Sequence, residues 1–273
     1  DDVESRGLGD VYKRQVDNSI PKFSYASSFG VSSIFPWQRK GVAGFLKRLD
    51  LIGVREQRGK QIVKELTGKD AKVVCDPTFL LTTDEWIEAL MENEKERGLE
   101  RNGEPYKIDT PYILAYVLGE RKDVREEIKK LREQSGLKIV NLPHVDNYHA
   151  MDDNLGDINL YDVDPFDFIR LIRDAEYVVT DSFHGSVFSI QMHKKFLTFY
   201  RKPSSEKGNT NSRIDSLFNI LGLSERLYKG DVFNQIKKNI DYGYVDRQVE
   251  ELRIDSLAFF KQALSLIHIS EPT

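Results

Sequence analysis

One segment of the chain, residues 174–201, combines a titratable side chain with the local pattern of a ligand site. It reads D-A-E-Y-V-V-T-D-S-F-H-G-S-V-F-S-I-Q-M-H-K-K-F-L-T-F-Y-R. The pattern predicts a strand over Tyr177–Val179, a turn, a helix, and a second strand over Phe196–Tyr200, which is the repeating unit of a parallel α/β sheet. Ligands of such sheets bind beyond the carboxyl ends of the strands. We therefore expect His184, in the turn, to lie at a binding edge.

The same turn favours an anion. The start of a helix presents backbone N–H groups and a positive dipole end, and Gly185 has no Cβ to keep a ligand away from the backbone. Histidine is the side chain best suited to proton transfer near neutral pH. The turn thus indicates an anion pocket that contains an imidazole. The alternative is structural: Asp181 or Ser182 only caps the helix, and His184 is an ordinary structural histidine.

Two arginines, Arg55 and Arg213, are candidates to bind such an anion. Arg55 follows the apolar strand Leu51–Val54, where a planar guanidinium would meet a carboxylate or phosphate. Arg201 opens a basic, Gly- and Ser-containing loop. Arg213 falls in the first turn of a predicted helix, where its charge opposes the helix dipole and so hints at another role. The alternatives are a surface ion pair of Arg55 with Glu56 or a neighbour, and a tolerated surface arginine at position 213.

Acidic residues at strand ends and in loops are weaker candidates for a functional site. Asp76 ends a predicted strand, but Asp-Pro also stops a strand and begins a turn, and we favour that structural interpretation. Asp162-Val-Asp164 resembles the D-x-D of metal-dependent sugar-nucleotide enzymes, yet Asp164 before Pro165 is the usual start of a helix. The polar loop 143–163 also carries metal-ligand side chains in no helix-based spacing, which favours a solvated loop over a metal site: His144, His149, Asp152 and Asp153.

Composition limits the class of protein. Of 273 residues, 40% are hydrophobic and 31% charged, as in soluble globular proteins. The formal net charge of −4 argues against a general nucleic-acid partner, and no apolar run is long enough to cross a bilayer. Cys75 is the only cysteine, so no intrachain disulfide can form. We expect a cytoplasmic protein that works either free or at the inner face of the membrane.

Two runs of alternating strands and helices predict two domains. A stretch without periodicity, residues 99–110, separates them and contains Gly103 and Pro105. We place the first domain at residues 16–108 and the second at 109–264. The predicted strands are Lys22–Ala26, Leu51–Val54, Ala71–Cys75, Tyr112–Leu118 and Lys138–Leu142, besides the two in the segment above. The predicted helices are Trp37–Leu49, Glu56–Leu66, Thr83–Arg97, Asp123–Glu133, Pro165–Arg173, Arg213–Leu221 and Val249–Leu264.

The two ends of the chain do not read as natural protein. Residues 1–15 begin without Met, and residues 265–273 read S-L-I-H-I-S-E-P-T. Both resemble translated adapter sequence of the kind found in metagenomic fragments. We therefore expect both segments to be non-native and leave them out of the predicted fold.

Several stretches together resemble the polysaccharide pyruvyl transferase family. They are T-D-S-F-H-G-S-V-F-S-I, S-Y-A-S-S-F-G, G-V-R-E-Q-R-G, D-P-T-F-L-L and N-S-R-I-D-S-L-F-N-I-L-G-L, over about residues 20–225. The resemblance implies an α/β fold with two Rossmann-like domains facing a cleft, similar to the glycosyltransferase B type, here with an incomplete N-terminal domain. It also implies transfer of a pyruvyl group from phosphoenolpyruvate to a sugar of a bacterial surface polysaccharide, forming a ketal.

The resemblance also implies roles for particular residues. His184 matches the family histidine used in acid/base chemistry, and Arg55 matches an arginine that binds the donor. Many members have arginine where this chain has Ser182, so Arg201 or Arg213 is a candidate replacement. We expect Ser182 and Gly185 to contact the anion.

These roles define the expected partners and their alternatives. The partners are phosphoenolpyruvate, as donor substrate, and a glycan or lipid-linked saccharide acceptor, with no metal or other cofactor. One alternative is a nucleotide-sugar glycosyltransferase of the same broad fold. Another is a carbohydrate-binding protein with a degenerate site, which the missing N-terminal segment of the family would favour.

Overall fold

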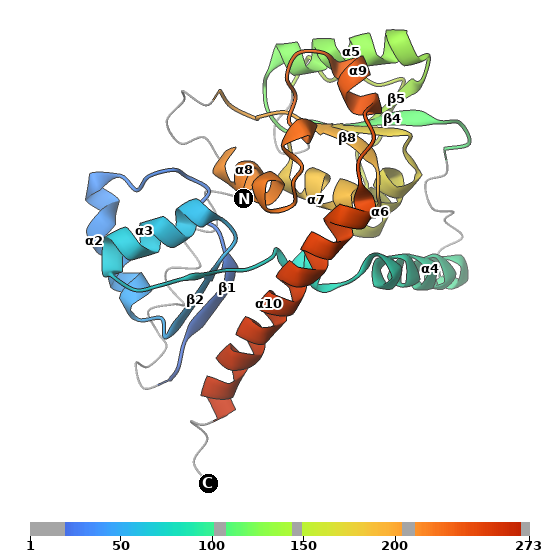
Figure 1. Ribbon diagram of the computed structural model, residues 1–273. Coiled ribbons are helices and arrows are strands. Elements are labelled where there is room, and N and C mark those ends of the chain that lie inside the picture. The colour runs from blue at the N-terminus through green and yellow to red at the C-terminus, as the bar shows by residue number, and fades with distance from the viewer. Residues whose placement is uncertain (1–19, 101–107, 144–148, 204–210, 269–273) are drawn as a thin grey trace.

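The computed structural model describes residues 20–100, 108–143, 149–203 and 211–268 (Figure 1). These residues form two parallel β-sheets with helices against them. The first sheet has the strand order β1-β2-β3 and the second the order β6-β5-β4-β7-β8. The strands of the first sheet are β1 (Phe23–Ser27), β2 (Leu51–Val54) and β3 (Lys72–Val73). Those of the second are β4 (Tyr112–Tyr116), β5 (Lys138–Asn141), β6 (Ile158–Asn159), β7 (Tyr177–Thr180) and β8 (Lys195–Thr198).

The first sheet is covered on both faces. Helices α2 (Pro36–Lys47) and α3 (Gln57–Thr67) bury Ile52, Val54 and Val63 on one side. The other side packs against the end of the last helix, α10 (Tyr242–His268), through Phe259. A Cβ on Gly53 would come within 2.8 Å of the Phe259 ring, so this close approach of helix and sheet requires glycine.

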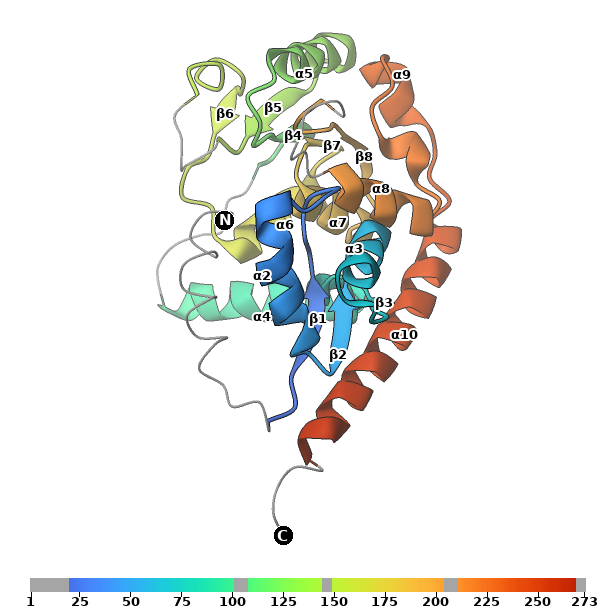
Figure 2. The same ribbon diagram turned by 90° about the vertical axis from the view of Figure 1, so that its left-hand side faces the viewer.

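The second sheet is also a three-layer unit. Figure 2 shows α5 (Lys122–Ser135) and α9 (Val232–Lys237) on one side of it, with α6 (Pro165–Asp174), α7 (Phe183–Gln191) and α8 (Asn211–Ile220) on the other. Its central strands are buried on both faces, as parallel strands in α/β proteins are. Two short 3₁₀ helices complete the described elements, η1 (Pro77–Leu80) and η2 (Ser224–Arg226).

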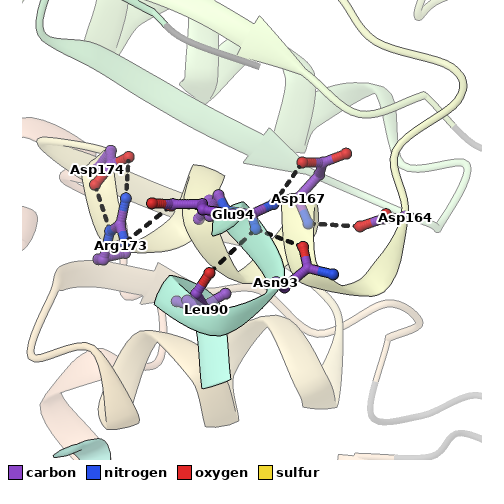
Figure 3. Close-up of polar contacts among 8 residues, drawn as sticks. Leu90, Asn93, Glu94, Asp164, Asp167, Arg173 and Asp174 are labelled. Carbon is purple, nitrogen blue, oxygen red and sulfur yellow. Dashed lines mark hydrogen bonds and ion pairs between the residues drawn. The ribbon is translucent and has the colours of Figure 1, made fainter. Parts of the chain in front are cut away.

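Two helices each pack against the unit on the other side of the domain boundary expected at residue 108. Helix α4 (Thr83–Glu100) precedes that boundary in sequence, yet Leu90 belongs to the core of the second unit. Figure 3 shows α4 docked on α6. There the buried guanidinium of Arg170 bonds Asp167, Asn93 and Glu94 at 2.6–2.9 Å. In the opposite direction, α10 starts against the second unit and ends against the first sheet.

Most predicted elements are present, with shifted ends. Gly68 and Gly136 end α3 and α5 in the left-handed conformation expected of a helix C-cap. Several predictions were wrong in extent. The strand predicted over Ala71–Cys75 has only two residues, β8 begins and ends before its predicted bounds, and α10 begins seven residues before Val249. Helix α10 also includes residues 265–268, which we expected to be a non-native tail. The pattern missed β6, α9 and both 3₁₀ helices because they are too short for periodicity to be visible.

Candidate functional site

The site is built where the carboxyl ends of the two sheets meet. Arg55 follows β2, Asp76 follows β3, and His184 lies in the first turn of α7, after β7. The guanidinium of Arg55 donates through Nη1 to Oδ2 of Asp76, and Nε2 of His184 lies 3.7 Å from the same oxygen. One carboxylate of the first unit thus faces an arginine of its own unit and a histidine of the other.

Asp76 is held in its ionised form. Its side chain is only 2% exposed, and burial alone would raise its pKa. That effect is more than offset by His184, by the N–H of Thr78, 3.1 Å from Oδ1, and by Arg55, so the pKa of Asp76 lies well below its ordinary value. Asp76 also caps η1, the structural role predicted for it. The sequence pattern does not reveal its second role as the acceptor that orients Arg55 and faces His184.

A phenyl ring supports two cations beside this carboxylate. The guanidinium carbon of Arg55 is 5.1 Å from the centroid of the Phe183 ring, and that of Arg213 is 6.0 Å from it. Both distances lie within the range of cation–π attraction. Arg55 Nε is buried and has no hydrogen-bond acceptor among the described residues. Arg213, from the first turn of α8, thus lies over the same ring as Arg55, and its role toward an anionic ligand stays a prediction.

A buried glutamate shapes the loop after β1. Glu56 is fully buried, and its Oε1 accepts from Ser28 Oγ at 3.0 Å and from the backbone N–H groups of Phe29 and Gly30 at 2.8 and 3.3 Å. Glu56 therefore ties this loop to the start of α3, next to Arg55. A surface ion pair with Glu56 or a neighbour was the alternative to anion binding by Arg55. The structure instead pairs Arg55 with Asp76 and turns Glu56 toward the loop.

The start of α7 has a structural reason for both of its small residues. Ser182 is the N-cap, and its Oγ accepts from the N–H of Gly185 at 3.3 Å. A Cβ on Gly185 would lie 2.4 Å from Oγ1 of Thr180. Glycine is thus needed to pack α7 against β7, which is a different reason from the ligand approach that we expected. The N–H of Gly185 and the hydroxyl of Ser182 already engage each other, so anion contacts by these two groups stay a prediction.

Arg201 belongs to a neighbouring cluster around the carboxylate of Asp181. Its Nε is 3.8 Å from Oδ1 of that buried carboxylate, which also accepts from the N–H groups of Leu118 and Gly119 at 2.8 and 2.7 Å. Burial raises the pKa of the Asp181 carboxyl above its ordinary value, although these N–H groups and Arg201 oppose the rise. A Cβ on Gly119 would meet both Asp181 and Arg201 at 2.8 Å. Asp181 thus joins the end of β4 to the end of β8.

Two of the aspartates considered for metal binding have structural contacts instead. Asp152 is buried in a two-point ion pair with Arg125, and Asp164 caps α6 as predicted, accepting from the N–H of Asp167 at 2.7 Å. His144 lies outside the described residues. Within the described ranges, no group of three or more His, Cys, Asp or Glu side chains is placed to hold a metal ion. Nor is any described helix long and apolar enough to span a bilayer.

Comparison with known proteins identifies the family. A family model described as polysaccharide pyruvyl transferase matches residues 8–203, a stretch that contains Arg55, Asp76 and His184. The chain belongs to the polysaccharide pyruvyl transferase family. This is a family of transferases. The match begins at residue 8, within the segment predicted to be non-native. No curated protein sequence matches the chain.

Solved structures show the fold. UDP-N-acetylglucosamine 2-epimerase from Rickettsia bellii has a TM-score of 0.55 and 12% identity, over 96% of this chain and 71% of that protein. The corresponding enzyme from Neisseria meningitidis has a TM-score of 0.46 and 12% identity, over 82% of this chain and 65% of that one. The S. aureus MnaA–UDP structure has a TM-score of 0.49 and 17% identity, over 98% and 72%. The first of these likenesses supports two Rossmann-like domains of the glycosyltransferase B type, as predicted.

Proposed function

We propose that this member of the family transfers the pyruvyl group of phosphoenolpyruvate to two hydroxyls of a sugar in a bacterial surface polysaccharide. The observation that carries the proposal is the convergence of Arg55, Arg213 and His184 around Phe183 and Asp76. The donor carries a phosphate and a carboxylate, and guanidinium groups recognise both through charge-assisted hydrogen bonds. Asp76 orients Arg55, whose Nε is left without an acceptor among the described residues.

The reaction needs a proton donor and a proton acceptor at one place. Protonation of the methylene carbon of the enol turns it into a methyl group and makes the adjacent carbon electrophilic. A sugar hydroxyl adds to that carbon, phosphate leaves with its bonding electrons, and a second hydroxyl closes the ketal. The two hydroxyls release two protons: one is the equivalent of the proton added to carbon, and the other leaves with phosphate.

His184 is the side chain that we assign to this proton transfer. Its side chain is 54% exposed, so substrate can reach it, and its Nε2 faces the ionised carboxylate of Asp76. A carboxylate beside an imidazole is a common element of acid/base sites. General acid/base catalysis by one positioned histidine contributes about 10²–10⁴-fold in rate.

The direct test is product formation. The chain is incubated with phosphoenolpyruvate and a panel of polysaccharide-derived oligosaccharides, and the ketal methyl group is followed by NMR together with released phosphate. We expect both products in equal amounts, and a fall of about 10²-fold or more in His184→Ala. His193→Ala is the matched control, because His193 pairs with Asp246 on the surface and lies outside the site. Full transfer activity in His184→Ala would refute the assignment.

A nucleotide-sugar glycosyltransferase is the second candidate. It is favoured only by the shared fold, since the epimerases named above act on a UDP-sugar. A nucleoside diphosphate that competes with phosphoenolpyruvate would distinguish the two reactions.

A further inference from the structure

His184 also lines a cavity on the side of the second unit. The cavity has a volume of about 370 Å³ and lies at the carboxyl ends of β4 and β5, next to the start of α6. We call it the aromatic pocket, after four of the side chains that line it together with His184: Tyr116, Tyr161, Phe168 and Phe188. Its size falls in the range of small-molecule sites, about 300–1,000 Å³.

The walls of the aromatic pocket are fixed by packing. The Phe168 ring meets the Tyr116 ring edge to face at 4.9 Å between centroids and the Phe188 ring at 6.0 Å. Trp86 of α4 packs edge to face against Phe188 from behind, at 5.2 Å. Such edge-to-face pairs hold ring orientations. The pocket is therefore preformed, which lowers the entropic cost of binding a ligand.

Of the four aromatic side chains that define the pocket, Tyr161 is the one exposed to solvent. Tyr161 is 59% exposed, one of the most exposed large apolar side chains that the structure describes. It follows β6 and lines the pocket together with residues of α6 and α7. An exposed aromatic ring in the lining of a preformed pocket is well placed to cover a ligand, because rings bring large contact area at small entropic cost.

The charge of the lining selects among ligands. The lining that the structure describes includes the carboxylate-bearing Asp164 and no lysine or arginine. This contrasts with the neighbouring cluster, where Arg55 and Arg213 flank Phe183. A phosphate or carboxylate group would thus favour the arginine side and be disfavoured in the pocket. The pocket suits a neutral ring with one apolar face, and a pyranose is such a ring. Its C–H face packs on aromatic rings, and its hydroxyls form hydrogen bonds with polar groups at the edge.

We propose that the aromatic pocket is the subsite for a neutral pyranose ring of the acceptor. The inference rests on the proposed function, because it takes His184 to be the group that exchanges a proton with an acceptor hydroxyl. His184 is the residue that both lines the pocket and faces Asp76 of the donor cluster. A ring held against Phe168 and Tyr161 would place its hydroxyls at that imidazole, within the hydrogen-bond reach that proton transfer requires.

The test is binding of uncharged sugars to the full chain. Saturation-transfer NMR is recorded with methyl pyranosides of the gluco, galacto, manno and 2-acetamido series, and with uridine as a nucleoside. The variants are Tyr161→Ala, which changes an exposed side chain, and Tyr244→Ala, a matched control on α10 whose tyrosine is 42% exposed. Phosphoenolpyruvate affinity is measured on the same samples by calorimetry.

We expect at least one pyranoside to bind the wild type and to bind Tyr161→Ala about two- to tenfold more weakly, which is the range for losing one aromatic contact. Its affinity for Tyr244→Ala should equal that for the wild type. Phosphoenolpyruvate affinity should not change in either variant. Three results would overturn the proposal while the proposed function stands: the donor binds but no pyranoside does, pyranosides bind equally to wild type and Tyr161→Ala, or uridine alone depends on Tyr161. Absence of phosphoenolpyruvate binding by the wild type would instead refute the proposed function itself.

Discussion

Replacing Gly185 by alanine should destabilise the protein, although alanine is the better helix former. Gly185 lies in the first turn of α7, and the added Cβ would stand 2.4 Å from Thr180 Oγ1 and 3.1 Å from Thr180 Cβ and Cγ2. Real Cβ contacts closer than 3.0 Å essentially never occur, so α7 or Thr180 must shift by more than half an ångström. This is the kind of overpacking that a close-packed interior resists.

The magnitude follows from how firmly Thr180 is held. Its Oγ1 donates to the carbonyl of Tyr116 at 2.6 Å and accepts from the N–H of Ser182 at 3.0 Å, so it cannot rotate away without losing both bonds. Overpacking costs about 1–3 kcal/mol, and each hydrogen bond contributes about 1 kcal/mol net. The higher helix propensity of alanine offsets about 1 kcal/mol of this destabilisation. We expect Gly185→Ala to lower the free energy of unfolding by about 2 kcal/mol.

Thermal unfolding followed by circular dichroism measures this effect. A loss of about 2 kcal/mol corresponds to a fall in Tm of roughly 4–8 °C in proteins of comparable size. Gly44→Ala is the matched control, since Gly44 lies in α2 and a Cβ there meets no atom within 4 Å. This control should be neutral or stabilising by up to about 1 kcal/mol. Thr180→Ala completes a double-mutant cycle, in which the two changes together should cost less than their sum.

Two outcomes would refute this reasoning. One is a Gly185→Ala variant with the Tm of the wild type, which would mean that α7 does not lie against Thr180 as the structure places it. The other is strict additivity with Thr180→Ala, which would mean that the cost arises elsewhere.

Two further predictions concern buried charges. The pKa of Asp76 lies below its ordinary value of 3.8 in the folded state, so its carboxylate adds stability above that value and the contribution is lost as pH falls below it. The excess stability of wild type over Asp76→Asn, from urea unfolding, should therefore shrink as pH falls from about 5 to below 4; a difference that does not change over this range would contradict this. Arg170→Met leaves the buried carboxylate of Asp167 without its cation and should cost about 3–5 kcal/mol in the same assay. Arg173→Met, which loses a more exposed pair on the same helix, should cost about 1 kcal/mol or less, and equal losses would argue against the docking of α4 on α6.

The sequence pattern predicted much of the fold because the relevant signals are local. Gly68 and Gly136 end their helices through a left-handed backbone that glycine adopts freely. Asp164 begins α6 with a capping carboxylate followed by proline. Buried parallel strands appear as continuous apolar runs. Each of these features is decided by a few neighbouring residues.

The remainder depends on contacts between distant parts of the chain. Asp76 meets Arg55, which is 21 positions away, and His184, which lies on another unit; locally it reads as the start of a turn. Periodicity predicts that α10 buries one face, but it does not say which unit receives that face. The prediction of α4 as a helix does not say which unit it packs against. The sequence alone does not distinguish Arg170 from a surface arginine, because its partners Asn93 and Glu94 come from α4.

Binding of phosphoenolpyruvate at Arg55 is the most direct test of the proposed function. The measurement is isothermal calorimetry on the wild type, Arg55→Ala and the matched variant Arg58→Ala, whose arginine pairs with Glu65 on the surface of α3. We predict saturable binding by the wild type, a loss of about 10- to 100-fold in Arg55→Ala, as expected for a charge-assisted contact, and no change in Arg58→Ala. Absence of binding at millimolar donor, or equal affinity in all three proteins, would contradict a donor site at the meeting edge of the two sheets.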